Sequence, residues 1–411
     1  MFMYYICLNK LHYPPIYMSK GYLSINNVAM AFTYKLCASR ITLSTLLLLL
    51  FLCCPNPSSA TAPKLFKKIY AFGDSFTDTG NTNSSTGSIF FTHVSNPPYG
   101  RTFFHRPTNR YSDGRLVIDF VAQALSLPFL PPYMDPKADR SHGISFAVAG
   151  ATAISYRFFE KNNVSLDITP QSLGTQLGWF NRYLESVGCR DYKTTPTQCG
   201  DVFDDALFWV GAIGAGDYAF TSGSSIPRKT LRRLAISNIN GFIQALLKKG
   251  AKYMVVEGLP TLGCLTANLY LYTDRDAMGC AATVNNESHA HNAVLQANLR
   301  SFRAHFPHAT IVYADYWSAY ASVLANPSKY GIAEPFKACC GSATGDPLNF
   351  DIFETCGSPH TKSCPDPSMY INWDGGHLTE AMYKAVADEL LNGTFCHPPF
   401  GYLLSKKMSS G

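Results

Sequence analysis

The stretch Lys68-Ile69-Tyr70-Ala71-Phe72-Gly73-Asp74-Ser75-Phe76 decides the fold of this 411-residue chain. Its apolar start, closed by a glycine, predicts a short buried strand over residues 68–72 that runs into a turn. Similar strand-like runs recur at residues 206–210, 253–257 and 310–313. Helical patterns lie between and after them, at residues 116–125, 173–187, 228–248, 287–304 and 379–392. Strands that alternate with helices predict an α/β fold with a parallel sheet covered on both faces.

Ser75 follows the first predicted strand by only a few residues, at the edge where a parallel sheet presents its functional groups. A serine hydroxyl is a weak nucleophile unless a base takes its proton and a third group orients that base. Asp374 and His377, separated by two glycines just before a predicted helix, supply both groups. Each motif alone is a common turn, but together at the two ends of an α/β pattern they predict a catalytic triad.

Longer motifs then resemble the plant GDSL esterase/lipase family of the SGNH hydrolases. The matching segments are Phe72-Gly73-Asp74-Ser75-Phe76-Thr77-Asp78-Thr79-Gly80-Asn81, Asn96-Pro97-Pro98-Tyr99-Gly100, Arg110-Tyr111-Ser112-Asp113-Gly114-Arg115, Phe146-Ala147-Val148-Ala149-Gly150-Ala151 and residues 373–380. The resemblance covers nearly all of residues 66–395, in order. It implies a three-layer α/β/α, flavodoxin-like fold with Ser75 as nucleophile, His377 as general base and Asp374 orienting it. It implies no metal and no organic cofactor.

The resemblance also implies an oxyanion hole with three donors: the N–H of Ser75, the N–H of Gly150 and an asparagine side chain. This chain departs from the family at the third donor, because Gly216 stands in Gly214-Ala215-Gly216-Asp217 where the asparagine belongs. Loss of one such donor costs about 10²–10³ in turnover. The sequence therefore predicts an ester hydrolase, with a weakened or inactive relative that binds an acyl or glycan ligand as the alternative.

Residues 1–60 are predicted to be a targeting segment. They contain four basic residues, no acidic residue and the apolar run 46–54, followed by small residues up to Ala60. The run is shorter than the roughly 20 residues of a membrane span, so we expect a signal peptide cleaved after Ala60. An uncleaved anchor is the alternative, and the long stretch before Met30 makes Met30 an alternative start. The expected location is extracellular, in the cell wall or apoplast, or else vacuolar.

The charge and the cysteines fit a secreted protein. Of 34 basic and 28 acidic residues, four basic ones lie in residues 1–60, which leaves a net charge of +2 and predicts no nucleic-acid partner. Nine cysteines remain, so at least one is unpaired. The pairs Cys189 and Cys199, and Cys264 and Cys280, flank polar loops and suggest local disulfides, although spacing leaves the connectivity open. N-glycosylation motifs occur at Asn83, Asn163, Asn286 and Asn392.

Residues 61–411 are predicted to form a single domain with loop insertions near residues 80–115 and 337–366. The first insertion contains aromatic residues that either line an acyl groove or pack against the core: Phe90, Phe91, Tyr99, Phe103 and Phe104. Asp78 and Asp113 either orient the site loops or cap their own turns. The second insertion has zinc-like residue types, for which disulfides are the preferred interpretation: Cys339, Cys340, Cys356, His360 and Cys364.

His289 and His291 lie two apart on a predicted helix, so they point to different faces and are expected to be solvated. No Gly-x-Ser-x-Gly elbow, phosphate loop or dinucleotide motif occurs. The sequence thus predicts a secreted monomer that hydrolyses a carboxylic ester of a lipid, an acylated metabolite or a glycan. An acyl-enzyme at Ser75 is the expected intermediate.

Overall fold

The central sheet of the computed structural model has six strands in the order β10-β5-β4-β3-β1-β2. The structure describes residues 64–409, except 84–90, 165–168, 192–193 and 343–344, so the predicted signal segment and Phe90 lie outside the described residues. Five neighbouring strands are parallel, and β10 at one edge is antiparallel to β5. The strands are β1 (Lys68–Phe72), β2 (Gly143–Ser145), β3 (Ala206–Val210), β4 (Tyr253–Glu257), β5 (Thr310–Ala314) and β10 (Cys396–His397).

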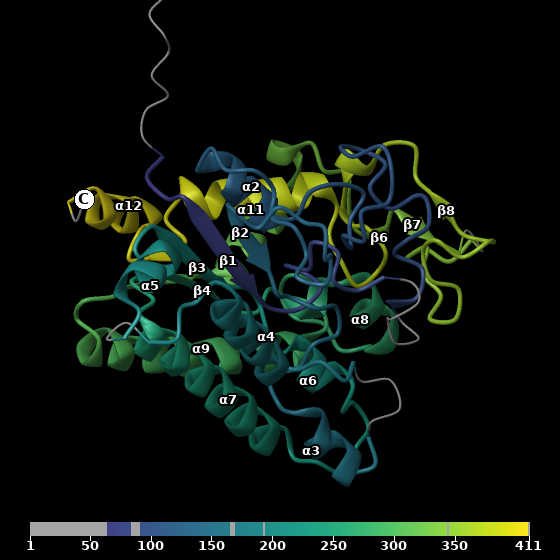
Figure 1. The fold of residues 1–411 in the computed structure, drawn as a ribbon. Helices are drawn as coiled ribbons and strands as arrows, with labels where there is room; N and C mark the ends of the chain where they lie inside the picture. Colours follow the sequence, from purple (N-terminus) through teal and green to yellow (C-terminus); the bar gives the residue numbers. More distant parts are fainter. Residues whose placement is uncertain (1–63, 84–90, 165–168, 192–193, 343–344, 410–411) are drawn as a thin grey trace, which may run out of the picture. The chain divides into compact units, whose positions relative to one another are not determined.

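Helices cover both faces of this sheet (Figure 1). On one side α11 contacts α2, α10 and α12, and on the other α7 contacts α4, α6 and α9. The helices are α2 (Val117–Ala124), α3 (Tyr156–Lys161), α4 (Leu173–Ser186), α5 (Pro196–Phe203), α6 (Ala215–Ala219), α7 (Arg228–Lys249), α8 (Thr266–Leu271), α9 (Ala282–His305), α10 (Tyr316–Ala325), α11 (Glu380–Leu391) and α12 (Phe400–Ser409). Short 3₁₀ turns are η2 (Leu262–Cys264), η3 (Pro327–Tyr330) and η4 (Pro367–Met369). The predicted three-layer α/β/α fold is confirmed.

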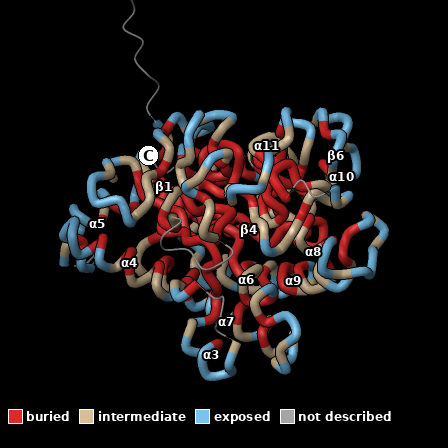
Figure 2. Tube along the Cα trace, turned by 90° about the vertical axis from the view of Figure 1, so that its right-hand side faces the viewer, coloured by how far each residue is buried: buried red, intermediate tan, exposed pale blue. Residues whose placement is uncertain are grey.

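The sheet is buried on both faces, as near-continuous apolar strands require. Every residue of β3 and β4 is buried, and the buried residues run through the middle of the trace in Figure 2. At the β2 edge, Gly143 pairs with Ile69 and has φ +116°. A Cβ there would lie 1.9 Å from the carbonyl oxygen of Ile69, so only glycine lets β2 reach β1.

Two small sheets hold the second predicted insertion. β6 (Glu334–Ala338) pairs with β9 (Tyr370–Asn372), and β7 (Cys340–Gly341) pairs with β8 (Lys362–Ser363). Disulfides join Cys339 to Cys364 and Cys340 to Cys356, so these four cysteines are not zinc ligands. The predicted disulfides Cys189–Cys199 and Cys264–Cys280 are also present, and Cys396 is left as a buried free thiol.

The predicted elements agree with the structure at most boundaries. The four predicted strands and five predicted helices are all present, although α9 begins five residues before the predicted start. The sequence did not predict the short strands β2, β6, β7, β8, β9 and β10 or the helices α3, α5, α6, α8, α10 and α12. Among the described residues, no helix is both long and apolar enough to cross a membrane. Residues Lys64–Gly411 form one compact unit.

Candidate active site

Ser75 lies at the carboxyl end of β1, in the turn that leaves the sheet. The turn is fixed from α4 by Gln176, whose side-chain oxygen accepts a hydrogen bond from the N–H of Gly73 at 3.0 Å. The amide nitrogen of Gln176 donates to the carbonyl oxygen of Gly73 at 2.7 Å. Ser75 is 6% exposed, so its hydroxyl is sheltered but remains on the wall of a pocket. The role of Gln176 is not visible in the sequence, because it lies 103 positions from Gly73.

His377 and Asp374 follow β9 and reach Ser75 from the other end of the chain. Ser75 Oγ lies 2.7 Å from Nε2 of His377, and Nδ1 of His377 lies 2.9 Å from Oδ2 and 3.0 Å from Oδ1 of Asp374. The backbone N–H groups of Gly376 and His377 donate to Oδ1 of Asp374 at 3.0 and 2.8 Å. The structure therefore brings the three predicted residues into hydrogen-bond contact, in the order that proton transfer from a serine requires.

The carboxylate of Asp374 is buried but stabilised. Burial alone would raise its pKa, yet the neighbouring His377 imidazole and hydrogen bonds from His377, Tyr99 and Gly376 outweigh burial and lower the pKa. The hydroxyl of Tyr99 donates to Oδ2 of Asp374 at 2.8 Å. Burial raises the pKa of Tyr99 well above its ordinary value, which keeps it a neutral donor. From the sequence, Tyr99 was expected either to line an acyl groove or to pack against the core, and its contact with Asp374 was not predicted.

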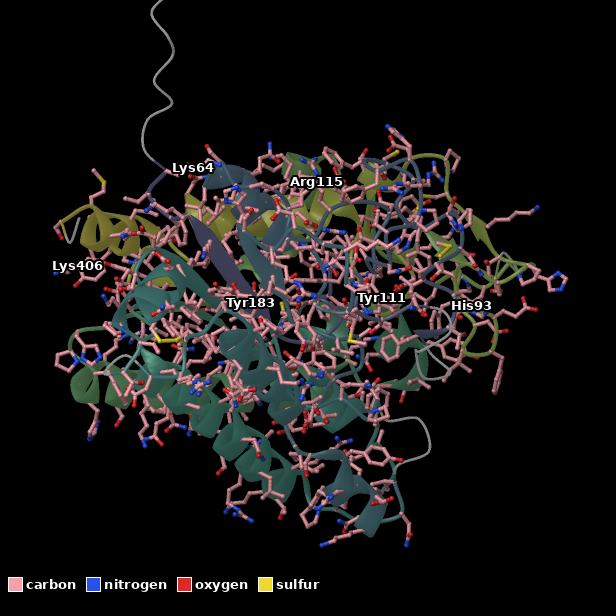
Figure 3. The ribbon with its side chains drawn as sticks, in the orientation of Figure 1. Lys64, His93, Tyr111, Arg115, Tyr183 and Lys406 are labelled. Carbon is pink, nitrogen blue, oxygen red and sulfur yellow. A yellow bond between two sulfur atoms is a disulfide. The ribbon has the colours of Figure 1, made fainter. Side chains whose placement is uncertain are left out.

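Aromatic rings enclose the imidazole of His377. The ring of Tyr111, labelled in Figure 3, has its centroid 4.7 Å from that of His377, and Phe76 and Phe91 lie at 5.7 and 6.2 Å. Phe76 belongs to the main core, whereas Phe91 packs against a second apolar cluster that includes Tyr111. The buried residues of this second cluster are Val94, Tyr99, Tyr111, Ala149, Cys339, Cys340, Cys356 and Trp373. The disulfide-linked insertion is thus part of the foundation of the site.

Gly150 lies against the same pocket as Ser75. Its φ is +72°, and a Cβ there would lie 2.3 Å from Oγ1 of Thr169 and 2.7 Å from the ring of Phe91. The neighbouring Ala149 N–H donates to Oδ2 of Asp78 at 2.9 Å. Asp78 also accepts hydrogen bonds from its own turn, so it both caps that turn and positions the Gly150 loop. Both interpretations offered for Asp78 therefore apply.

Asp113 likewise connects two loops. One of its carboxylate oxygens accepts a hydrogen bond from the N–H of Glu380, the first residue of α11, at 2.8 Å, and the other contacts the hydroxyl of Thr102. Because His377 lies three residues before α11, Asp113 anchors the helix that follows the histidine. Its role is at the helix start, outside the pocket.

Gly216 lies on α6, beside Gly150. A Cβ built on Gly216 would lie 3.3 Å from the carbonyl oxygens of Gly150 and Ala151 and 3.1 Å from the ring of Phe220. Position 216 therefore faces the strand end where a third oxyanion donor is expected. The next residue, Asp217, accepts hydrogen bonds from the N–H groups of Ala153 and Ile154 at 2.8 and 2.9 Å and holds α6 against this loop.

Three buried carboxyl groups lie around the nucleophile turn. Burial raises the pKa of Asp74, Asp217 and Glu257 to about 7 in each case. Glu257, at the end of β4, accepts a hydrogen bond from the N–H of Ala212 at 2.9 Å. These three carboxyl groups accept backbone hydrogen bonds and so hold the loops in place. The side chain that contacts the Ser75 hydroxyl is His377.

The pocket beside Ser75 holds about 400 Å³ and is mostly apolar. It extends from Ser75, His377, Gly150 and Gly216 to α8, the first turns of α9 and the loop around Phe350. Phe91 and Tyr99 line it, whereas Phe103 and Phe104 pack on Phe129 and on arginine side chains. Two described residues of the aromatic stretch thus line the pocket, and two others pack on neighbouring side chains.

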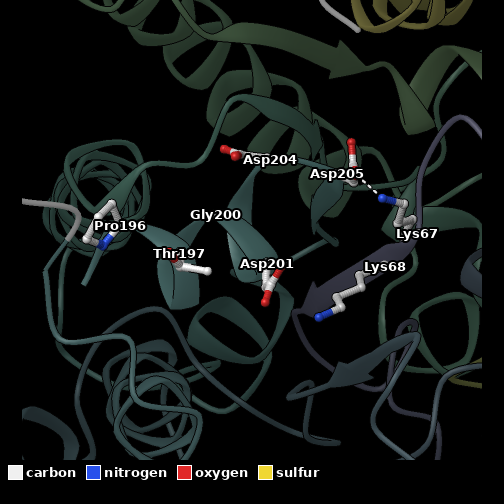
Figure 4. Close-up of a pocket in the computed structure, with 8 residues that line it drawn as sticks. All are labelled: Lys67, Lys68, Pro196, Thr197, Gly200, Asp201, Asp204 and Asp205. Carbon is white, nitrogen blue, oxygen red and sulfur yellow. Dashed lines mark ion pairs between the residues drawn. The ribbon is translucent and has the colours of Figure 1, made fainter.

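A second hollow, of about 580 Å³, lies at the amino end of β1 (Figure 4). It is lined by Lys67 and Lys68 at the start of β1 and by acidic residues before β3. Lys67 pairs with Asp205 at 2.7 Å, and Lys252 pairs with Asp204 at 2.7 Å. None of the residues that line this hollow forms a nucleophile–base contact like that of Ser75 and His377, so the candidate site is the pocket at Ser75.

One prediction about the histidines is wrong. His291 is only 1% exposed, and its Nδ1 lies 2.8 Å from the hydroxyl of Tyr218, where burial lowers the pKa of His291 to about 3. The helix α9 turns this residue inward onto α6, whereas His289 is exposed as predicted. The prediction failed because His289 and His291 lie on different faces of α9, and only the face of His289 is turned to solvent.

Comparisons with known proteins agree with this geometry. Residues 69–390 match the family model described as GDSL-like Lipase/Acylhydrolase. The chain is 54% identical to the GDSL esterase/lipase At3g48460 of Arabidopsis thaliana, over 86% of this chain and 93% of that protein. It is 40% identical to the GDSL esterase/lipase At1g28600 of the same plant, over 84% and 88%. The chain therefore belongs to the GDSL-like lipase/acylhydrolase family of ester hydrolases.

Proposed function

We propose that this protein hydrolyses carboxylic esters through an acyl-enzyme at Ser75. The observation that carries the proposal is the 2.7 Å contact between Ser75 Oγ and Nε2 of His377, with Asp374 bonded to the other ring nitrogen. Nε2 takes the hydroxyl proton as Oγ attacks the ester carbonyl carbon. The tetrahedral intermediate collapses, and the alcohol leaves with the proton held by His377.

Water completes the cycle. With His377 again as base, a water molecule attacks the acyl carbonyl, the acid is released and Ser75 regains its proton. Asp374 stays ionised and holds Nδ1–H of His377, and the imidazolium is stabilised by this carboxylate. The N–H groups of Ser75 and Gly150 are the proposed donors to the oxyanion, and Gly216 contributes no side chain to it.

The apolar pocket supports an acyl group of a lipid or of an acylated metabolite or glycan as the bound part of the substrate. The alternative function is binding of such a ligand without efficient turnover, and Gly216 is the observation that favours it. We further propose that the protein is secreted as a monomer and glycosylated. Four disulfides support an oxidising compartment, and the glycosylation motifs at Asn163 and Asn286 are exposed.

The test uses a fluorophosphonate serine-hydrolase probe together with turnover of p-nitrophenyl acetate. Wild type should be labelled and should turn over the ester, and Ser75→Ala should lose both. Ser405→Ala is the matched control, because Ser405 is an exposed serine on α12. Equal labelling and turnover in wild type and Ser75→Ala would refute the nucleophile. An unlabelled, inactive wild type that still binds acyl ligands would favour the alternative.

A further inference from the structure

Large apolar side chains are exposed at the mouth of the active-site pocket. Leu271, at the end of α8, lines the pocket and is 54% exposed. Its neighbour Tyr270 is 46% exposed, and its ring stacks edge-on at 5.6 Å against Phe350, another lining residue. Phe353 is 93% exposed and follows the lining residue Ile352 by one position. Tyr270, Leu271 and Phe353 are together called the apolar rim.

The apolar rim stands on firmly held elements. The N–H of Ala267 in α8 donates to the carbonyl oxygen of Gly375, in the triad turn, at 2.9 Å. The loop that carries Phe353 is closed by the Cys340–Cys356 disulfide. Oγ1 of Thr355, in that loop, lies 3.0 Å from Nδ1 of His93. These side chains are therefore exposed on elements tied to the triad turn or closed by a disulfide, and exposed apolar surface beside a pocket marks an interaction site.

The charges around the apolar rim limit its partner. Asp351 and Glu354 flank Phe353, and no lysine or arginine occurs in residues 338–361 or 258–274. Arg275, which follows α8, directs its guanidinium to backbone carbonyls, including that of Leu269 at 2.8 Å. Basic residues attract proteins to anionic lipid surfaces, and the two segments that carry the apolar rim contain none, so the rim disfavours such a surface. Arg228, which lines the pocket itself, donates to the carbonyl oxygen of Tyr218. The apolar rim suits an uncharged surface.

We propose that the apolar rim docks the protein on the surface of an aggregated, uncharged ester, from which single substrate molecules enter the pocket. The proposal rests on the proposed ester hydrolysis and adds the physical state of the substrate. Its main support is continuity: Leu271 belongs at once to the exposed rim and to the wall of the pocket that contains Ser75.

The first test measures binding without turnover. Ser75→Ala protein is mixed with emulsified p-nitrophenyl palmitate, and the fraction that floats with the droplets is measured. Adding Phe353→Asp should lower that fraction at least tenfold. Adding Met408→Asp should not, because Met408 is 70% exposed on α12, at the far side of the sheet from α8 (Figure 1). Both side chains are exposed, so neither change should disturb folding.

The second test compares turnover of emulsified p-nitrophenyl palmitate with that of dissolved p-nitrophenyl acetate. The ratio of the two rates should fall at least tenfold in Phe353→Asp relative to Met408→Asp. Equal droplet binding by the two variants would overturn the proposal, as would binding to anionic phosphatidylserine vesicles as strong as to the emulsion. Droplet binding that depends on Phe353, in a protein that hydrolyses no ester, would refute the proposed function and leave the docking surface standing.

Discussion

Restoring an asparagine at position 216 is the sharpest test of how the oxyanion is stabilised. Gly216 has an ordinary helical position on α6, and a Cβ there would lie 3.3 Å from the carbonyl oxygens of Gly150 and Ala151. The tightest contact is 3.1 Å to the ring of Phe220, a half-buried residue at the end of α6 that is able to yield by a few tenths of an ångström. The backbone therefore admits a side chain, and an amide at this position would reach toward the Gly150 loop.

The expected gain follows from the number of donors. Ser75 and Gly150 offer two N–H groups, and Gly216→Asn adds a third donor aimed at a charge that exists only in the transition state. One such donor is worth about 10²–10³ in turnover, or roughly 3–4 kcal/mol. We therefore expect kcat to rise about a hundredfold or more, with KM little changed, because the ester carbonyl in the ground state gains little from it.

Initial rates on p-nitrophenyl acetate at pH 8 measure this gain. Gly216→Ala is the matched control, since it adds the same Cβ contacts without an amide, and it should leave kcat within about threefold of wild type. The melting temperatures of both variants establish that each is folded. If folded Gly216→Asn turns over no faster than Gly216→Ala, the missing side chain does not limit catalysis and the reasoning about the third donor is refuted.

Tyr99→Phe removes the 2.8 Å hydrogen bond to Asp374, worth about 1.5–3 kcal/mol for a charged acceptor, so kcat should fall about tenfold or more; an unchanged kcat would contradict this role. Burial raises the pKa of Glu257 from 4.5 to about 7, so the unfolded chain releases this proton first and stability falls as pH rises between those values. As the pH rises from 4.5 to 7, the free energy of unfolding measured by urea titration should therefore fall by up to about 3 kcal/mol more in wild type than in Glu257→Gln. Parallel pH profiles of the two proteins would refute this prediction. Gly143→Ala should destabilise the fold by about 3 kcal/mol, because its Cβ would lie 1.9 Å from the Ile69 carbonyl oxygen; a wild-type melting temperature would exclude this clash.

The sequence by itself determined the elements whose signal is local. The strands β1, β3, β4 and β5 are apolar runs that need no partner to be recognised, and the long helices repeat apolar residues every three to four positions. Closeness in the chain only suggested the pairing of Cys189 with Cys199, which the structure confirms. The triad segment is also a local signal, because Asp374 and His377 lie within one turn.

Only the tertiary structure decided what depends on distant residues. β2 and β10 have two or three residues each, and they exist as strands because β1 and β5 offer backbone partners. Tyr99 reaches Asp374 across 275 positions, and Gln176 reaches Gly73 across 103, so no periodicity announces either contact. Adjacent cysteines are chemically equivalent in the sequence, and the strands β7 and β8 selected which of them meets Cys356 and which meets Cys364.

Ser75 and the apolar rim illustrate the same division. The sequence placed Ser75 at a strand end and supplied a base for it, since both are local features. The 2.7 Å contact with His377, and the meeting of α8 with the disulfide-closed loop at one pocket mouth, come from packing. A residue's exposure and its neighbours are properties of the whole fold, because they depend on which surfaces the other elements cover.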